Sequence, residues 1–273
     1  MEAFNMKSSV ATSSGTVQRV VEILKYFGEA GDTTIKELSA VLGLVPSTCH
    51  RMLDLLSKEG LVERDDVKRG YRVGPEFYRI AALVHSRQDV RRLARPILQQ
   101  VVDACDETCV LGLYLPREGR MIFAEKVDSS HLLRYQLPMN SQLSVLWGAS
   151  GQSIIAFLPQ AETDKIYASS GPAPASKEPP PSRTELESIL VSIRERGYAV
   201  SSGQKIAGAV GINAPVFDVT GRVIGCLGVT VPEQRITSTN VKKLGELVRQ
   251  HARALSEMLG APVTTNTFPG AAS

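Results

Sequence analysis

Two helix signals joined by a short glycine turn constrain this sequence more than any other feature. Residues 34–37 have the form of a capping box and open a helix that runs through Val41. Gly43 supplies the turn, and Pro46 suits the first position of the next helix, which ends at Gly60. A junction this short between two helices predicts a helix-turn-helix.

The segments on either side complete a small domain. Before the pair, apolar residues recur along one helix face, and Thr16 is placed to cap that helix. The apolar residues are Val17, Val20, Val21, Leu24 and Phe27. After the pair, residues 61–64 and 71–73 read as strands around a turn at 65–70, which predicts a two-stranded wing. A small helical domain with a solvated hairpin is the alternative.

Polar groups crowd the N-terminal half of the second helix of the pair, opposite its apolar side. Such groups can reach phosphates and base edges where a recognition helix meets the major groove of DNA. They are Ser47, Thr48, His50 and Arg51. His50 by itself could be an ordinary surface histidine. In the wing, Lys68, Arg69 and Arg72 suit phosphate contacts that position a protein without reading sequence.

Composition permits nucleic-acid binding without arguing for it. The 273 residues carry a formal net charge of only +3, and acidic and basic residues balance within residues 15–74. A basic footprint must therefore come from the arrangement of charges. The sequence has neither a signal-peptide pattern nor an apolar run of membrane-spanning length, so we expect a cytoplasmic protein with no membrane partner.

The rest of the chain alternates between helix and strand patterns. We expect residues 75–90 to form a linker helix and residues 91–260 to form a larger domain, between a disordered leader (1–14) and a disordered tail (261–273). The order of elements predicts an antiparallel sheet with helices packed on it, an α+β fold. The expected strands are 110–115, 120–127, 132–137, 198–200, 212–217 and 223–231. The expected helices are 148–158, a helix capped by Thr184 that ends at Arg196, and 238–259, with a proline-rich surface loop at 171–183.

From Thr16 to Gly260, the chain resembles the IclR family of bacterial regulators, both in the order of its elements and in specific residues. The resemblance rests on residues 16–19, 23–24, 44–53, 71–74, 149–151, 196–199 and 208–218. It implies a winged helix-turn-helix domain followed by a GAF-like effector domain, and it adds Thr16 and Arg19 to the DNA-binding residues. It further implies homodimers that pair into tetramers, palindromic operators on double-stranded DNA, and a repressor controlled by a small molecule. A sensor that acts mainly through protein partners is the alternative.

The resemblance also implies where the effector binds. In the family it lies against the sheet, held by backbone amides at the turn matching Ala149 and Ser150. The side-chain positions that correspond to the rest of the family site are Ser201, Gly211, Gly228 and Thr230. Sensors of small keto acids carry an acidic residue, a cysteine and a serine at the first three of these positions. Three polar groups are therefore smaller or absent here.

Nearby residues favour a larger ligand. Tyr135 and Trp147 are aromatic candidates for the same site, and Cys226 lies in an apolar strand where it faces either the site or the core. Because pockets bind mostly through apolar area, smaller walls and nearby aromatics predict an aromatic or other bulky catabolite as effector, in preference to glyoxylate or pyruvate.

We expect neither catalysis nor a metal or cofactor. Cys105 and Cys109 stand one helical turn apart, but a closed zinc site needs four ligands, so core packing explains them better. Residues 150–151 and 201–203 contain serines without a recognisable base, and the sequence has no nucleophile elbow, phosphate loop or zinc-protease motif.

Overall fold

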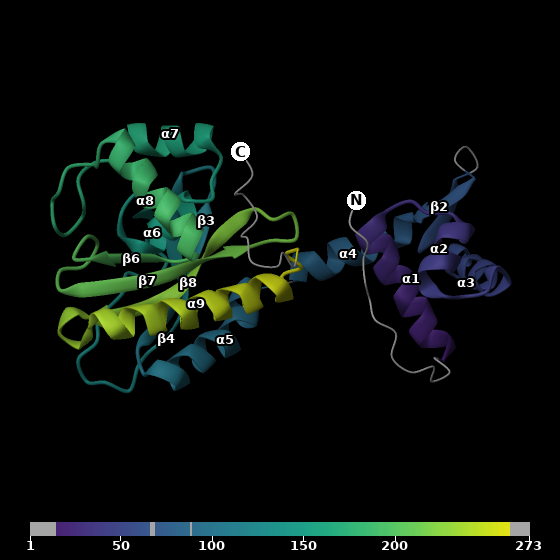
Figure 1. Ribbon diagram of the computed structural model, residues 1–273, viewed down its shortest axis with the longest axis horizontal. Coiled ribbons are helices and arrows are strands. Elements are labelled where there is room, and N and C mark those ends of the chain that lie inside the picture. The colour runs from purple at the N-terminus through teal and green to yellow at the C-terminus, as the bar shows by residue number, and fades with distance from the viewer. Residues whose placement is uncertain (1–14, 66–68, 88, 263–273) are drawn as a thin grey trace. The chain divides into compact units, whose positions relative to one another are not determined.

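A computed structural model describes residues 15–65, 69–87 and 89–262, which fall into two structural units with the division after Gln88. Helix α4 (Pro75–Arg87), the predicted linker, closes the first unit, and α5 (Val90–Cys105) opens the second (Figure 1). The predicted leader and all but two residues of the predicted tail lie outside the described residues.

Ahead of α4, the first unit is a three-helix domain with a hairpin. Its helices are α1 (Thr16–Ala30), α2 (Ile35–Leu42) and α3 (Pro46–Lys58). The predicted capping box is confirmed, because the Thr34 hydroxyl accepts from the Glu37 amide and the Glu37 carboxylate accepts from the Thr34 amide. Gly43 turns the chain in the left-handed region at φ 62°, where an L side chain is strained. The helices enclose one core, formed by Ile23, Phe27, Leu38, Cys49, Met52, Leu53, Leu56, Val62 and Tyr71.

The predicted cap of α1 is wrong, and its predicted packing face is confirmed only in part. Gly15, in extended backbone, precedes the helix, and Thr16 is already its first helical residue, so the threonine hydroxyl makes no capping bond. Val17 is 77% exposed and Val21 is also exposed. Phe27 is buried as predicted, and Val20 and Leu24 pack partly buried against the same core, together with Ile23, which the predicted face does not include.

The wing is present where it was predicted. Strands β1 (Val62–Asp65) and β2 (Gly70–Val73) pair antiparallel. Thr33 and Tyr71 exchange two backbone hydrogen bonds of 2.7 and 2.9 Å, which tie the returning strand to the turn before α2. The hairpin therefore belongs to the helical domain and is not a loose appendage.

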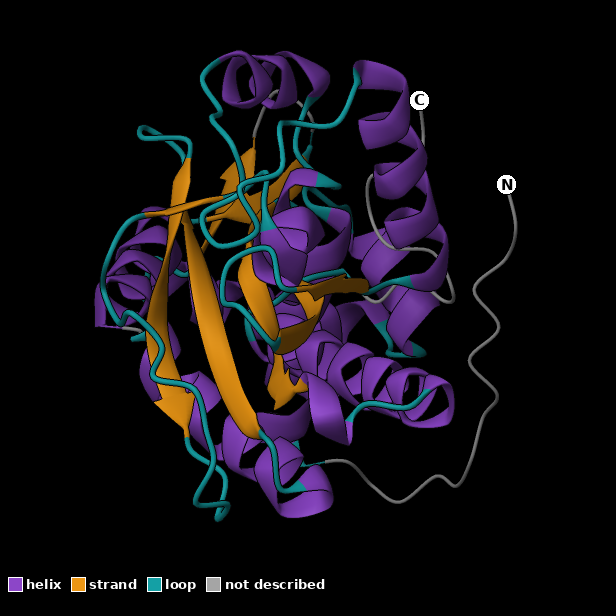
Figure 2. Ribbon diagram, turned by 90° about the vertical axis from the view of Figure 1, so that its left-hand side faces the viewer, coloured by secondary structure: helices purple, strands orange, loops and turns teal. Residues whose placement is uncertain are grey.

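The second unit is built on a curled antiparallel sheet of six described strands in the order β5-β4-β3-β8-β7-β6 (Figure 2). The strands are β3 (Thr108–Leu115), β4 (Arg120–Val127), β5 (Leu143–Ser144), β6 (Ala199–Ser202), β7 (Ala209–Phe217) and β8 (Val223–Pro232). Helices α5 and α9 (Ser238–Met258) cover one face, and α6 (Gly148–Ile155), α7 (Gln160–Ala168) and α8 (Arg183–Arg196) lie on the other (Figure 1). Each face buries its own apolar core, and the predicted α+β class is confirmed.

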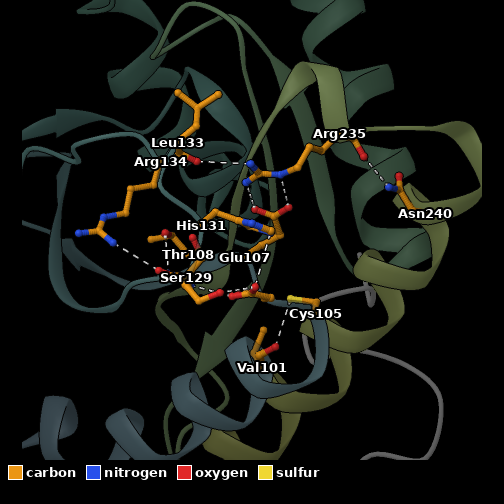
Figure 3. A network of polar contacts seen from close by, with 12 residues as sticks. Val101, Cys105, Glu107, Thr108, Ser129, His131, Leu133, Arg134, Arg235 and Asn240 are labelled. Carbon is orange, nitrogen blue, oxygen red and sulfur yellow. Dashed lines mark hydrogen bonds and ion pairs between the residues drawn. The ribbon is translucent and has the colours of Figure 1, made fainter.

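The strand predicted at 132–137 is wrong. The segment has no strand partner, and Leu132 and Leu133 project into solvent, so its apolar alternation does not report a buried face. Arg235 holds the segment instead, because its guanidinium donates to the Leu133 carbonyl at 3.3 Å and pairs with Glu107 through two bonds of 2.8 and 2.5 Å (Figure 3). Asn240 donates to the Arg235 carbonyl and adds the start of α9 to the network (Figure 3).

The predicted cap of α8 is also wrong by two residues. The Ser182 hydroxyl accepts from the Glu185 amide, and the Glu185 carboxylate accepts from the Ser182 amide. The sequence offers this spacing twice, at 182–185 and 184–187, and the structure uses the earlier one. Helix α7 was not predicted, since only Thr163 and Ile166 of its residues are buried. None of the described helices combines the length and the apolar character needed to cross a bilayer.

Candidate functional sites

The polar face of α3 gathers three of the four residues predicted for it. Ser47, His50 and Arg51 line one surface hollow together with Asp54 and with Ile35 of α2. The His50 Nδ1 lies 2.9 Å from the Asp54 carboxylate one turn along, and both side chains are about half exposed. Thr48 is partly buried and does not line the hollow. The exposed groups thus form one face of α3.

The wing adds cations beside this domain. Arg69 is exposed in the hairpin turn at φ 51°, and Lys68 lies outside the described residues. Arg72 lies opposite Glu63 in the hairpin and donates to its carboxylate at 2.5 Å, a hydrogen bond that raises the pKa of the arginine. At the start of α1, Thr16 is exposed and Arg19 partly so. All of these side chains that the structure describes are thus at least partly exposed.

The second unit contains a pocket between the sheet, α6 and the loop that joins β6 to β7. Of the nine residues predicted for the effector, five line it: Ala149, Ser150, Ser201, Gly211 and Thr230. Apolar side chains form much of the remaining wall, namely Val110, Phe123, Leu137, Pro138, Leu143 and Ile206. A Cβ placed on Gly211 would lie 3.3 Å from that of Ala149, so the glycine keeps this part of the pocket wide.

The other four predicted residues do not line the pocket. Trp147 is buried and its indole N–H donates to the Gly171 carbonyl at 2.9 Å, which ties down the proline-rich loop. The Tyr135 hydroxyl lies over Gly208, and Cys226 is fully buried in the core. Gly228 has no room for a side chain, because a Cβ there would lie 2.2 Å from the Ile212 carbonyl oxygen.

Sequence reasoning missed four polar residues that line the pocket, Ser144, Gln204, Lys205 and Asn213. Gln204 and Lys205 belong to a loop flanked by Gly203 and Gly208, both in the left-handed region. A lysine between two glycines ahead of an apolar strand was the available signal. It does not say whether the side chain turns inward.

Side-chain oxygens cap the first amides of α6. The Ala149 amide donates to the Ser201 hydroxyl at 2.6 Å, and the Gly148 amide donates to the Gln204 side-chain carbonyl at 2.9 Å. Helix N-termini attract negative charge because their amides lack partners within the helix. Here two of those amides already have oxygen acceptors from the chain itself.

The cysteines behave as core residues. Cys109 is fully buried, and the Cys105 thiol donates to the Val101 carbonyl at 3.1 Å. Burial raises the pKa of both thiols, which keeps them protonated and disfavours metal binding. Within the described ranges no group of three His, Cys, Asp or Glu side chains is placed to hold a metal ion.

Comparison with known proteins identifies the family. The family model for the bacterial transcriptional regulator IclR C-terminal domain matches residues 82–257, and that for the IclR helix-turn-helix domain matches residues 16–66. This chain belongs to the IclR family. As an IclR-family protein it is a helix-turn-helix transcriptional regulator, and the prediction that it is not an enzyme agrees with this.

Individual relatives support this assignment along nearly the whole chain. The HTH-type transcriptional regulator XynR of Escherichia coli is 28% identical over 253 residues, covering 90% of this chain and 98% of XynR. The crystal structure of a putative IclR regulator from Silicibacter superposes with a TM-score of 0.81 at 23% identity, covering 93% and 99% of the two chains. An IclR homologue from Microbacterium hydrocarbonoxydans, solved with 4-hydroxybenzoate, gives a TM-score of 0.54 at 22% identity, covering 90% and 99%.

Proposed function

We propose that this IclR-family regulator reads an operator through the N-terminal half of α3 and releases it or holds it according to an effector in the pocket of its second unit. The observation that carries the DNA-binding half is the face formed by Ser47, His50 and Arg51 at the start of the second helix of a helix-turn-helix. Arg69 and Arg72 of the wing, with Thr16 and Arg19 of α1, supply phosphate contacts.

The operator that we propose is palindromic, because the protein acts as a homodimer or as a tetramer of dimers. Exposed apolar side chains on α4 support self-association: Tyr78 is 67% exposed, and Ile80 and Leu83 are also exposed. Val17 and Val21 add a similar patch on α1. Apolar groups on a short helical segment are typical of a contact with a second copy, and a two-fold dimer places two recognition helices on two half-sites.

For the effector we propose an acid with an apolar body no larger than one aromatic ring. The apolar wall around Phe123 and Ile206 supports a hydrophobic ligand, and the 4-hydroxybenzoate bound by the Microbacterium homologue is of this kind. The free volume of the pocket is about 90 Å³, less than the roughly 150 Å³ that admits benzene in a protein interior. A ring therefore enters only when lining side chains move, and Gln204 and Lys205 carry long side chains on a loop outside the strand pairings.

Repression is the mode of regulation that we propose, and it rests on the family resemblance alone. An effector shifts the DNA-bound population only as far as its affinities for the two states differ. In a repressor, the effector binds the state that does not hold the operator more tightly.

The experiment is a fluorescence-anisotropy titration of the full chain with duplexes from the region upstream of its own gene, with and without effector candidates. We expect sequence-specific binding that an aromatic acid weakens. A protein that binds no such duplex more tightly than a scrambled one, at equal salt, contradicts the proposal. A reporter placed behind the operator tests the mode of regulation. If its expression falls when the gene for this protein is deleted, the repressor part of the proposal is wrong and the DNA-binding part stands.

A further inference from the structure

Lys205 places a cation in a pocket that offers it no carboxylate. Its Nζ lies 2.9 Å from the Ser150 hydroxyl oxygen, 3.3 Å from the Met121 sulfur and 5.9 Å from the centre of the Phe123 ring. All three neighbours are buried, so the ammonium end is shielded from water although the residue as a whole is partly exposed. No Asp or Glu side chain lines the pocket in the described part of the chain.

The inward position of Lys205 is built into the fold. A Cβ on Gly148 would lie 2.8 Å from Cδ and 3.0 Å from Cγ of the lysine, so the stem occupies space that only a glycine leaves free. Gly148 also has a φ of 72°, which other residues rarely adopt. Together these features place the lysine stem against the first turn of α6.

Ordinary structural roles account poorly for this cation. A buried ammonium has three donors, and here it finds one neutral oxygen and one weak sulfur acceptor. A charge held away from water without an anionic partner costs stability, and perturbed groups of this kind cluster at functional sites.

In the same pocket, Asn213 adds a buried side-chain oxygen that has no hydrogen-bond partner in the described part of the chain. The residue is 3% exposed, and its Oδ1 is buried and accepts no hydrogen bond from the described residues. A Cβ on Gly228, opposite it in the β7–β8 pairing, would lie 2.4 Å from the Asn213 Cγ, so the absence of a side chain at 228 makes room for this amide. A buried carbonyl oxygen left without a donor destabilises the folded protein, and a ligand that supplies a donor removes that cost.

Two amides of the usual anion site at the N-terminus of α6 already have acceptors from the chain itself. The Ser201 hydroxyl and the Gln204 carbonyl accept from the amides of Ala149 and Gly148, so a carboxylate reaches those amides only by displacing them. The Lys205 ammonium, by contrast, has three N–H donors and hydrogen bonds only to the Ser150 oxygen and, weakly, to the Met121 sulfur.

We propose that Lys205 anchors the carboxylate of the effector and that Asn213 accepts a hydrogen bond from a hydroxyl or amino group of the same molecule. The effector is then a hydroxy- or amino-substituted carboxylic acid. This inference rests on the proposed function, because it names the ligand chemistry of the same pocket. In binding through the α6 amides, the backbone selects acids over neutral ligands. In our proposal the side chain of Lys205 makes that selection.

The test compares each acid with its uncharged amide on the full-length protein. The panel is 3- and 4-hydroxybenzoate, 4-aminobenzoate and lactate, each with its primary amide, measured by calorimetry. Lys205→Met removes the charge and keeps the length of the side chain, and Lys242→Met, at an exposed position on α9, is the matched control. Asn213→Leu removes the acceptor and nearly keeps the shape, and benzoate is the matched ligand without a donor.

We expect at least one acid to bind the wild type about 100-fold more tightly than its amide, and Lys205→Met to reduce that preference to about threefold or less. Lys242→Met keeps the full preference. Asn213→Leu lowers the affinity for a hydroxybenzoate about tenfold and leaves that for benzoate unchanged. Affinity for the acid falls with rising pH above about pH 8 in the wild type and not in Lys205→Met, a profile that a purely structural lysine would not produce.

Three results overturn the inference. The first is an acid preference that survives Lys205→Met, and the second is equal binding of acid and amide to the wild type. The third is that no member of the panel binds. In each case the proposed function stands if another compound, charged or neutral, binds the protein and changes its affinity for operator DNA, and it fails with the inference if none does.

Discussion

Replacing Lys205 by methionine should make the unliganded protein more stable at neutral pH. Burial lowers the pKa of Lys205 from its ordinary value of 10.5 to about 8, because the folded chain disfavours the charged form. Each tenfold change in proton affinity is worth about 1.4 kcal/mol, so holding the ammonium inside costs the folded state about 3 kcal/mol. Methionine fills similar space and carries no such cost.

The pH dependence has a defined sign and window. Below about pH 8 both the folded and the unfolded lysine hold their protons, and the full cost applies. Between pH 8 and 10.5 the folded chain has released its proton and the unfolded chain has not, so the cost shrinks as pH rises. At pH 10 about 1 kcal/mol of it remains. The titratable neighbour, Cys226, stays protonated across this window, since burial raises the pKa of its thiol to about 11.

Urea unfolding provides the measurement. Trp147 is the only tryptophan of the chain and is buried beside the pocket, so its fluorescence reports the second unit. We expect Lys205→Met to exceed the wild type by about 3 kcal/mol at pH 7 and by about 1 kcal/mol at pH 10, with Lys242→Met close to the wild type at both. A variant less stable than the wild type at pH 7, or a difference that does not change with pH, would refute the reasoning.

Three further predictions address the DNA-binding face and the pocket. Arg51→Ala should weaken operator binding by about 1–3 kcal/mol and affect a scrambled duplex much less, as measured by fluorescence anisotropy; equal losses on both duplexes would assign the arginine to phosphate contact. Arg69→Ala should weaken both duplexes alike and lower the slope of log K against log salt by about 1, so an unchanged slope removes Arg69 from the interface. Gly148→Ala should lower the free energy of unfolding, measured in urea, by about 1–2 kcal/mol and should weaken acid binding. The added methyl group strains a residue in the left-handed region and meets the Lys205 stem. A variant as stable as the wild type would mean that the stem lies elsewhere.

Local signals in the sequence predicted those elements whose partners are local. The capping box at 34–37 needs only residues within one turn, and it is present. At α8 two overlapping patterns compete, and a contact distant in sequence accompanies the one that forms: the Tyr167 hydroxyl donates to the Pro181 carbonyl, immediately before Ser182. The apolar alternation at 132–137 failed because whether an apolar segment forms a strand depends on a partner strand, and none is present there.

Some residues of the pocket could be predicted from the sequence and others could not. Positions such as Ser201 and Gly211 were accessible because the resemblance fixes the strand register, and both line the cavity. The inward turn of Lys205 depends on Gly148, more than fifty residues earlier in the chain, and the free oxygen of Asn213 depends on Gly228 across the sheet. No local pattern contains either relation.

The short segment between β6 and β7 has a consequence for how this regulator diverges from its relatives. Gln204 and Lys205 lie outside the strand pairings, so exchanging them alters the chemistry of the cavity while the sheet ladder and the two cores keep their composition. Selection can therefore retune what the protein responds to through a few codons, without first finding compensating mutations in the interior. A library restricted to residues 204 and 205 is accordingly the economical starting point for turning this chain into a biosensor for a different metabolite.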